Sequence, residues 1–201
     1  MLGSGEPRVP WEKQFDVDEV LDKAMRAFWS RGYEATSMQA LVKRMGINRG
    51  SLYATYRDKR ELFLAALRRY AATVHHRRLA EFEARYGPLE AIRHAFLVFI
   101  SQASDNEGNR GCFLTNTALE LAARDPDAGR IVAQAQKKTE AWFARMIRKG
   151  KAEGEVASHV KPGEAASALL ALLIGLSVLA RSRPEPALHY SIVDGAVRGL
   201  R

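Results

Sequence analysis

The sequence predicts an all-α fold, and three observations support that prediction. Apolar residues recur at spacings of three and four along almost the whole chain, and no sustained alternation of apolar and polar residues appears between turn signals. Hydrophobic residues make up 47% of the 201 positions, which is ample for a packed core. Capping residues and helix breakers divide the chain into nine expected helices.

The first expected helix covers residues 16–32. An aspartate can cap its start, either Asp16 or Asp18, and Gly32 can end it because glycine tolerates the left-handed conformation. One face of this helix carries an apolar stripe made of Val17, Val20, Leu21, Ala24 and Phe28.

The second and third expected helices are short and lie close together. The second covers residues 37–45, with Thr36 or Ser37 as its cap and Gly46 at its end. The third covers residues 49–57. Two short helices joined by a glycine-containing turn of three or four residues predict a helix-turn-helix motif.

Six further helices are expected after this motif. The first of them continues without interruption into the second half of the chain, so no flexible linker separates the two halves. Loops rich in Gly, Pro and polar residues separate the others. The expected ranges are 58–85, 89–102, 112–123, 127–151, 162–183 and 187–200.

Composition limits the environment and the partners of the protein. The formal net charge of +8 favours a polyanionic partner, and a single cysteine excludes an intramolecular disulfide framework. Residues 1–14 contain Gly and Pro in place of a signal peptide's apolar run, and we expect a flexible arm there. The longest apolar stretch, residues 165–180, is too short for a membrane span and is expected to be buried on nearly all sides. These features favour a cytoplasmic protein with no membrane partner.

Basic residues concentrate in the helix-turn-helix segment. In such a motif the second helix enters the major groove of DNA, and its first residues reach the base edges. Arg49 is the best candidate for a two-bond contact to guanine, and Gly50 allows a close approach of the backbone. The alternative is a solvated basic surface on an ordinary helical corner. The basic residues are Lys43, Arg44, Arg49, Arg57, Lys59 and Arg60, against one acid, Asp58.

Residues 27–63, AFWSRGYEATSMQALVKRMGINRGSLYATYRDKRELF, closely resemble the N-terminal DNA-binding domain of TetR-family transcriptional regulators. The matching features are RGY at the end of the first helix, TS at the start of the second, MGI in the turn, SLY in the third and K..LF at the start of the fourth. The number and order of the later helices also agree with that family.

The resemblance implies a TetR-like architecture with a helix-turn-helix domain at residues 15–62 and a ligand-binding and dimerisation domain at residues 63–201. It implies a homodimeric repressor that binds a double-stranded DNA operator and responds to a small molecule. Many members carry a larger residue at the position of Ala54, so specificity here is expected to depend on Arg49. By motif position the DNA contacts fall on Thr36, Ser37, Arg49, Gly50, Ser51, Tyr53, Tyr56 and Lys59.

The second half of the chain carries no catalytic constellation, cofactor motif or metal motif. His75 and His76 are adjacent, so they point to different faces of a helix, and we expect solvated side chains. No Gly-rich phosphate loop or nucleophile elbow is present. The sequence therefore predicts a protein that is not an enzyme.

Large apolar side chains at helical spacing offer material for a ligand pocket, although such residues are more often plain core. A few polar residues on the same helices could orient a largely apolar effector. The candidate pocket residues are Phe96, Phe99, Phe113, Asn116, Thr117, Trp142 and Met146, with Gln136 or Thr139 as a further polar group.

The single cysteine, Cys112, suggests a second way to switch the protein. It opens an expected helix two residues after Arg110, and both the helix dipole and the guanidinium favour a reactive thiolate if the thiol is exposed. Some regulators similar to this segment sense electrophiles or oxidants through a cysteine. The alternative is a small buried apolar residue.

The last two expected helices predict a dimer interface. The helix at residues 165–180 is more apolar than one side of a small bundle can cover, and its Ala, Gly and Ser residues allow close helix packing. Packing against symmetry mates would give a two-fold interface.

Overall fold

The computed structural model describes residues 16–103 and 110–201, apart from the side chains of residues 99 and 101–103. The expected arm at residues 1–14 lies outside this part of the chain. Within it the fold is all-α, and it has nine helices if the continuous run α4–η1–α5 is taken as one. The elements are α1 (Val17–Arg31), α2 (Met38–Met45), α3 (Arg49–Thr55), α4 (Lys59–Arg69), η1 (Tyr70–His76), α5 (Arg77–Arg85), α6 (Pro88–Ala103), α7 (Phe113–Glu120), α8 (Pro126–Ala152), α9 (Pro162–Ser182) and α10 (Pro186–Arg198).

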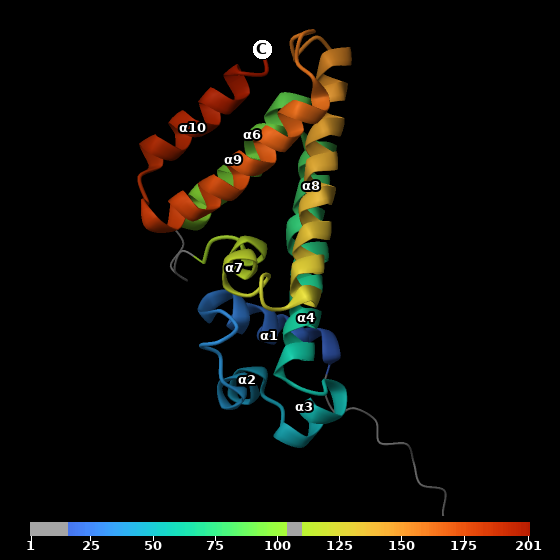
Figure 1. The fold of residues 1–201 in the computed structure, drawn as a ribbon, viewed down its shortest axis with the longest axis vertical. Coiled ribbons are helices and arrows are strands. Elements are labelled where there is room, and N and C mark those ends of the chain that lie inside the picture. Colours follow the sequence, from blue (N-terminus) through green and yellow to red (C-terminus); the bar gives the residue numbers. More distant parts are fainter. Residues whose placement is uncertain (1–15, 104–109) are drawn as a thin grey trace, which may run out of the picture.

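The first three helices form a small head at one end of the molecule, with α3 at its tip (Figure 1). Asp16 caps α1 and Ser37 caps α2 through side-chain acceptance of backbone N–H groups, as two of the sequence alternatives predict. Gly32 and Gly46 end these helices with φ values of 83° and 72°, which only glycine adopts readily. The buried interior of the head contains Phe28, Leu41, Met45 and Leu52, and Phe63 of α4 packs edge-on against Phe28.

The long helix from residue 59 to residue 85 joins the head to the rest of the molecule (Figure 1). The sequence predicts an unbroken α-helix here, and the structure corrects that expectation. Residues Tyr70–His76 form a π-helical segment, in which the wider turn shifts the register of the side chains. Periodicity of apolar residues does not resolve such a local insertion.

The remaining helices form a bundle in which α8 runs along the long helix and α9 packs across α8 and α6 (Figure 1). The aromatic rings of Phe63, Tyr70 and Phe113 meet edge to face between the head and this bundle. Phe96 stacks on Phe143 deeper in the bundle. One continuous buried core therefore extends from the head through the C-terminal half.

Helix α9 is less buried than its composition predicts. By length and composition it could cross a membrane, and only 33% of its most apolar window is buried within the single chain. The expectation of burial on nearly all sides is therefore wrong for one copy of the chain. One apolar face of α9 remains open, because α6, α8 and α10 contact other sides of it. The exposed positions on that face are Ala168, Ala171, Gly175, Val178 and Ser182.

Candidate nucleic-acid interface and interior cavity

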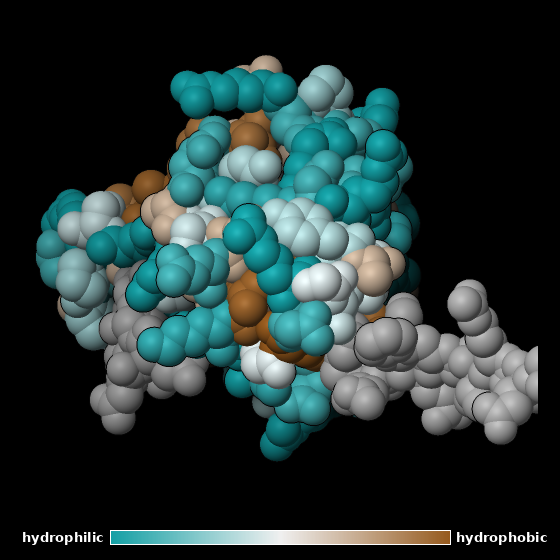
Figure 2. Space-filling model, turned by 90° about the horizontal axis from the view of Figure 1, so that it is seen from below, coloured by the Kyte–Doolittle hydropathy of each residue, from teal (hydrophilic) through white to brown (hydrophobic). Residues whose placement is uncertain are grey.

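Helix α3 is placed so that its first turn faces outward. The Asn48 side chain caps the helix by accepting a hydrogen bond from the Ser51 backbone N–H at 2.7 Å. Leu52 is fully buried and anchors the helix, while Arg49, Gly50 and Tyr53 are exposed. Hydrophilic residues cover most of this end of the molecule in the view from below (Figure 2).

Arg49 and Tyr53 form a pair on the exposed face of α3. They lie four residues apart, and the Arg49 guanidinium lies 5.7 Å from the centroid of the Tyr53 ring. A guanidinium over an aromatic face is held by a cation–π interaction, and its N–H groups stay available at the edge. The pair therefore presents planar hydrogen-bond donors beside a phenol hydroxyl.

The other candidate DNA contacts divide into outer and inner positions. Ser37 is exposed, and Ser51 and Lys59 are half-buried. Thr36 is only 1% exposed, and its hydroxyl donates a hydrogen bond to the Gly32 carbonyl at 2.6 Å. The Thr36 hydroxyl therefore closes the α1–α2 loop, and its expected DNA contact stays a prediction. Tyr56 is half-buried against the core, and desolvation raises the pKa of its hydroxyl.

A charged cluster joins the start of the long helix to the start of α8. The Arg60 guanidinium donates to both carboxylate oxygens of Asp125, at 2.5 and 2.8 Å, and also contacts Asp127. Hydrogen bonding to Arg60 lowers the pKa of the Asp125 carboxyl. Asp125 also caps α8 by accepting from the Asp127 and Ala128 backbone N–H groups. The long helix and α8 are thus tied together at this corner.

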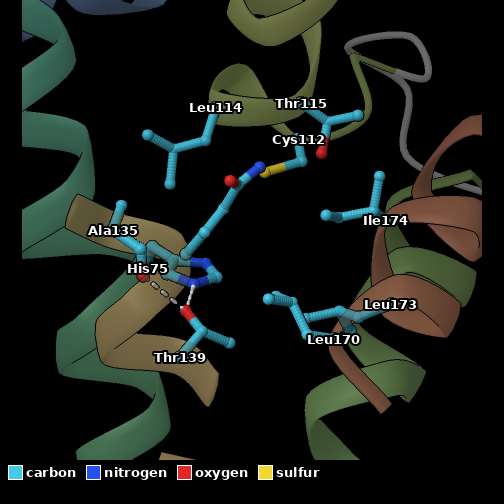
Figure 3. Close-up of a pocket in the computed structure, with 10 residues that line it drawn as sticks. His75, Cys112, Leu114, Thr115, Ala135, Thr139, Leu170, Leu173 and Ile174 are labelled. Carbon is cyan, nitrogen blue, oxygen red and sulfur yellow. Dashed lines mark hydrogen bonds between the residues drawn. The ribbon is translucent and has the colours of Figure 1, made fainter. Parts of the chain in front are cut away.

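An interior cavity lies between η1, α7, α8 and α9. Side chains from these elements point toward a common space (Figure 3). It encloses about 20 Å³, close to the room that one water molecule needs. No carboxylate, ammonium or guanidinium is among its lining residues, which are His75, Cys112, Leu114, Thr115, Ala135, Gln136, Thr139, Leu170, Leu173 and Ile174.

The environment of His75 differs most from the sequence prediction, which was a solvated side chain. Its ring borders this cavity and a second one of similar size lined partly by Tyr70, Phe82 and Leu173. Nε2 lies 2.8 Å from the Thr139 hydroxyl, and that hydroxyl donates to the Ala135 carbonyl. The single hydrogen of the Thr139 hydroxyl is used in that bond. The ring Nε2 must therefore carry a hydrogen and donate it to the hydroxyl oxygen. Burial lowers the pKa of His75 to about 4, so the ring is neutral at pH 7.

Most of the pocket residues expected from sequence lie elsewhere. Phe96, Trp142 and Met146 are buried in the core and line neither of these two cavities. Phe113 belongs to the aromatic cluster below the cavity, and the side chain of Phe99 lies outside the described part of the chain. The pocket residues predicted from the sequence were mostly large apolar side chains, and such side chains pack in the core and do not line a cavity.

The two polar pocket candidates on α7 have structural partners. The Asn116 amide donates to the Arg110 carbonyl at 2.8 Å and accepts from Arg181 at 2.9 Å. The Thr117 hydroxyl donates to the Phe113 carbonyl. Gln136 and Thr139, the two alternatives for a further polar group, both line the cavity, and Thr139 is also bonded to His75.

Cys112 is buried, with 5% of its surface exposed, and it lies in the cavity wall (Figure 3). The Tyr70 hydroxyl donates toward its sulfur at 3.8 Å. The Arg110 guanidinium lies over the Trp29 ring, 5.3 Å from its centroid. The thiol is therefore reached from the cavity rather than from the outer surface.

Two family models match the chain. The model for bacterial regulatory proteins of the tetR family matches residues 20–66, which include α2 and α3. A model for a tetracyclin repressor-like C-terminal domain matches residues 88–190, which include the cavity walls from α7, α8 and α9.

Several relatives and solved structures are similar over most of the chain. The uncharacterised HTH-type transcriptional regulator YezE of Bacillus subtilis is 35% identical over 144 residues, covering 72% of this chain and 74% of the relative. The HTH-type transcriptional repressor ComR of Escherichia coli is 30% identical over 178 residues, covering 88% and 82%. A cysteine-substituted TetR family regulator, CifR, solved with 26-base-pair operator DNA, matches with a TM-score of 0.80 at 28% identity, covering 98% of this chain and all of that one.

Proposed function

Because the chain belongs to the TetR family of bacterial regulatory proteins, we propose that it is a dimeric repressor that a small molecule releases from a pseudo-palindromic operator. Like other members of that family, it is a DNA-binding transcriptional regulator and is not an enzyme. A regulator of DNA acts inside the cell, and we propose the cytoplasm as its compartment.

The observation that carries the DNA-reading role is the exposed first turn of α3. Arg49 presents its guanidinium over Tyr53 at a helix whose other side is anchored by buried Leu52. Such a fork matches the two acceptors on the major-groove edge of guanine, a match worth about 1–3 kcal/mol against a wrong base. Gly50 leaves room for the backbone to approach DNA. Ser37, Ser51, Tyr53, Tyr56 and Lys59 are proposed to hold the phosphates.

Fluorescence anisotropy with the DNA upstream of the protein's own gene tests this role. Wild-type protein should bind that DNA more tightly than a scrambled duplex, and its affinity should fall steeply as salt rises because phosphate contacts release counterions. Arg49→Ala should lose preference for the operator. The matched control, Lys43→Ala, removes the same charge from an exposed position on α2 and should weaken binding to both duplexes equally. Equal losses of preference in the two variants would refute the assignment of Arg49.

The interior cavity supports a small, neutral and largely apolar effector. Its walls are mainly aliphatic, and the Thr115 hydroxyl, the Cys112 thiol and the neutral His75 ring add a few polar groups. Charged compounds find no partner among these lining residues. The enclosed volume of about 20 Å³ means that an effector must push α7, α8 and α9 apart to enter.

The open face of α9 supports dimerisation through α9 and α10. Exposed positions recur along it at alternating spacings of three and four, and four of the five are the small residues Ala168, Ala171, Gly175 and Ser182, which allow a symmetry-related helix to pack closely. Val178 is 39% exposed and Tyr190 on α10 is 46% exposed, both large apolar groups that a partner would cover. A two-fold dimer would place two copies of α3 at neighbouring half-sites.

Switching through Cys112 is the second candidate function, and the position of its sulfur in the cavity wall favours it. An electrophile that enters by pushing the cavity walls apart would meet the thiol, and its addition would enlarge the Cys112 side chain there. Treatment with N-ethylmaleimide should then release operator DNA from wild-type protein and not from Cys112→Ser. Unchanged binding in both proteins would eliminate thiol switching.

A further inference from the structure

The loop between α1 and α2, residues 32–36, is held from outside the head by one carboxylate. Glu120, the last residue of α7, accepts the Tyr33 backbone N–H at Oε2, 3.1 Å away, and the Glu34 backbone N–H at Oε1, 3.0 Å away. Two neighbouring amides of the head thus share both oxygens of a single side chain. Hydrogen bonds to a charged acceptor are stronger than those between neutral groups.

Gly32 makes this contact possible in two ways. Its φ of +83° is a conformation that other residues rarely adopt, and it turns the following amides toward α7. A Cβ atom at this position would lie only 2.8 Å from Glu120 Oε2, so any side chain would displace the carboxylate. The glycine that ends α1 therefore also creates the seat for Glu120.

The same loop is held on other sides by residues of the head and the long helix. The Lys59 ammonium lies 4.3 Å from the centroid of the Tyr33 ring and donates to the Glu34 carbonyl at 3.5 Å. The buried Thr36 hydroxyl closes the loop onto Gly32. Because Ser37 caps α2 immediately afterwards, the position of this loop sets where α2 begins.

Helix α7 connects this contact to the cavity over a short distance. Cys112, Leu114 and Thr115 at its start line the cavity, and Glu120 at its end holds the head. Eight helical residues span about 12 Å, so the two ends move together as one rigid element. A second route through Arg60 and Asp125 joins α4 to α8 and does not involve α7.

We infer that Glu120 is a positioning residue for DNA reading, which fastens the α1–α2 loop to the cavity wall and transmits displacement of α7 to the helix-turn-helix. This inference rests on the proposed DNA-reading role of α2 and α3. The carboxylate touches no DNA in this scheme. It holds the start of α2 where the exposed turn of α3 can meet the groove.

Glu120→Gln tests the inference because electrostatics alone predicts the opposite sign. The substitution keeps the shape of the side chain and removes a negative charge, which by itself should tighten DNA binding. The glutamine side chain has only one oxygen, so its NH2 group faces one of the two backbone N–H groups and that hydrogen bond is lost. Operator affinity should therefore fall by about tenfold. The matched control, Glu153→Gln, makes the same charge change on an exposed side chain at the far end of α8.

Hydrogen exchange provides a readout that does not depend on DNA. The amides of Tyr33 and Glu34 should exchange about tenfold faster in Glu120→Gln than in Glu153→Gln, while α9 exchanges equally in both, which shows that the variant is folded. Unchanged exchange at these two amides, or operator affinity equal to that of Glu153→Gln or tighter, would overturn the inference. If wild-type protein fails to prefer its operator, the proposed function fails, and the exchange result still decides the role of Glu120.

Discussion

His75 combines a half-buried ring, a hydrogen bond to Thr139 and a place between two cavities. The ring is neutral because burial, reinforced by the nearby charges of His76 and Arg78, disfavours the protonated form. Its Nε2 donates to Thr139, which leaves Nδ1 as the acceptor atom of the ring. A residue of this kind couples stability of the fold to pH.

Stability should fall as the pH drops from 7 to 5, partly because of His75. Its pKa of about 4 in the folded protein lies below the ordinary value of 6.5, so the unfolded chain takes up the proton first. The contribution is present above pH 6.5 and is lost as the pH falls toward 4, and between pH 7 and pH 5 it amounts to about 1–2 kcal/mol. Urea unfolding at both pH values measures it.

The comparison of variants isolates this contribution. His75→Gln should show a smaller loss of unfolding free energy between pH 7 and pH 5 than the wild type. His159→Gln, which removes an exposed histidine, should behave as the wild type does. The same pH dependence in all three proteins would mean that His75 is not held neutral by the fold.

Sequence reasoning at the residue level succeeded where a residue's role depends on its immediate neighbours. The caps Asp16 and Ser37 and the terminal glycines Gly32 and Gly46 follow from local backbone geometry, and the structure has them. The cavity residues were mostly missed, because a cavity depends on which helices meet. Gln136, Thr139 and Cys112 were named from the sequence, and His75 could have been found only by knowing that η1 faces α8.

At the level of elements, α8 depends on a residue that also joins it to the long helix. Asp125 caps α8 with one oxygen and receives Arg60 with both. Asp125→Ala removes the cap and the ion pair and should lower the free energy of unfolding by about 1–2 kcal/mol. Asp125→Asn keeps the capping oxygen, so it should cost less than the alanine variant. Thermal or urea unfolding that ranks the two variants equally would show that the cap contributes little.

Helix boundaries were predictable to within a few residues, but the π-helical segment within the long helix was not. Strong breakers such as Pro162 and Gly46 stand at the ends of α9 and α2 in both the sequence prediction and the structure. The π-helical segment Tyr70–His76 left no signal in the periodicity. Its first two residues, Tyr70 and Ala71, are buried, and such tertiary packing is not visible in the periodicity of one helix.

For the whole molecule, the open face of α9 predicts that the chain is a dimer. Ala171→Glu places a carboxylate in the middle of the small-residue stripe, where two copies would face each other across the two-fold axis. Light scattering after size exclusion should give the dimer mass for the wild type and the monomer mass for this variant, with weaker operator binding. Ala80→Glu, on the exposed face of α5, is the control and should remain dimeric. A dimer mass for Ala171→Glu would contradict the proposed interface.

The central claim is that two copies of α3, each led by Arg49, read a symmetric DNA site. Selection of binding sequences from a random duplex pool tests it most directly, with wild-type protein and Arg49→Ala compared. The wild type should select an inverted repeat whose half-sites lie about one or two helical turns apart, with a strongly preferred guanine in each half. Arg49→Ala should lose the preference for that guanine and keep the other positions. The same selected sequence for both proteins, or a wild-type sequence without an inverted repeat, would contradict the claim.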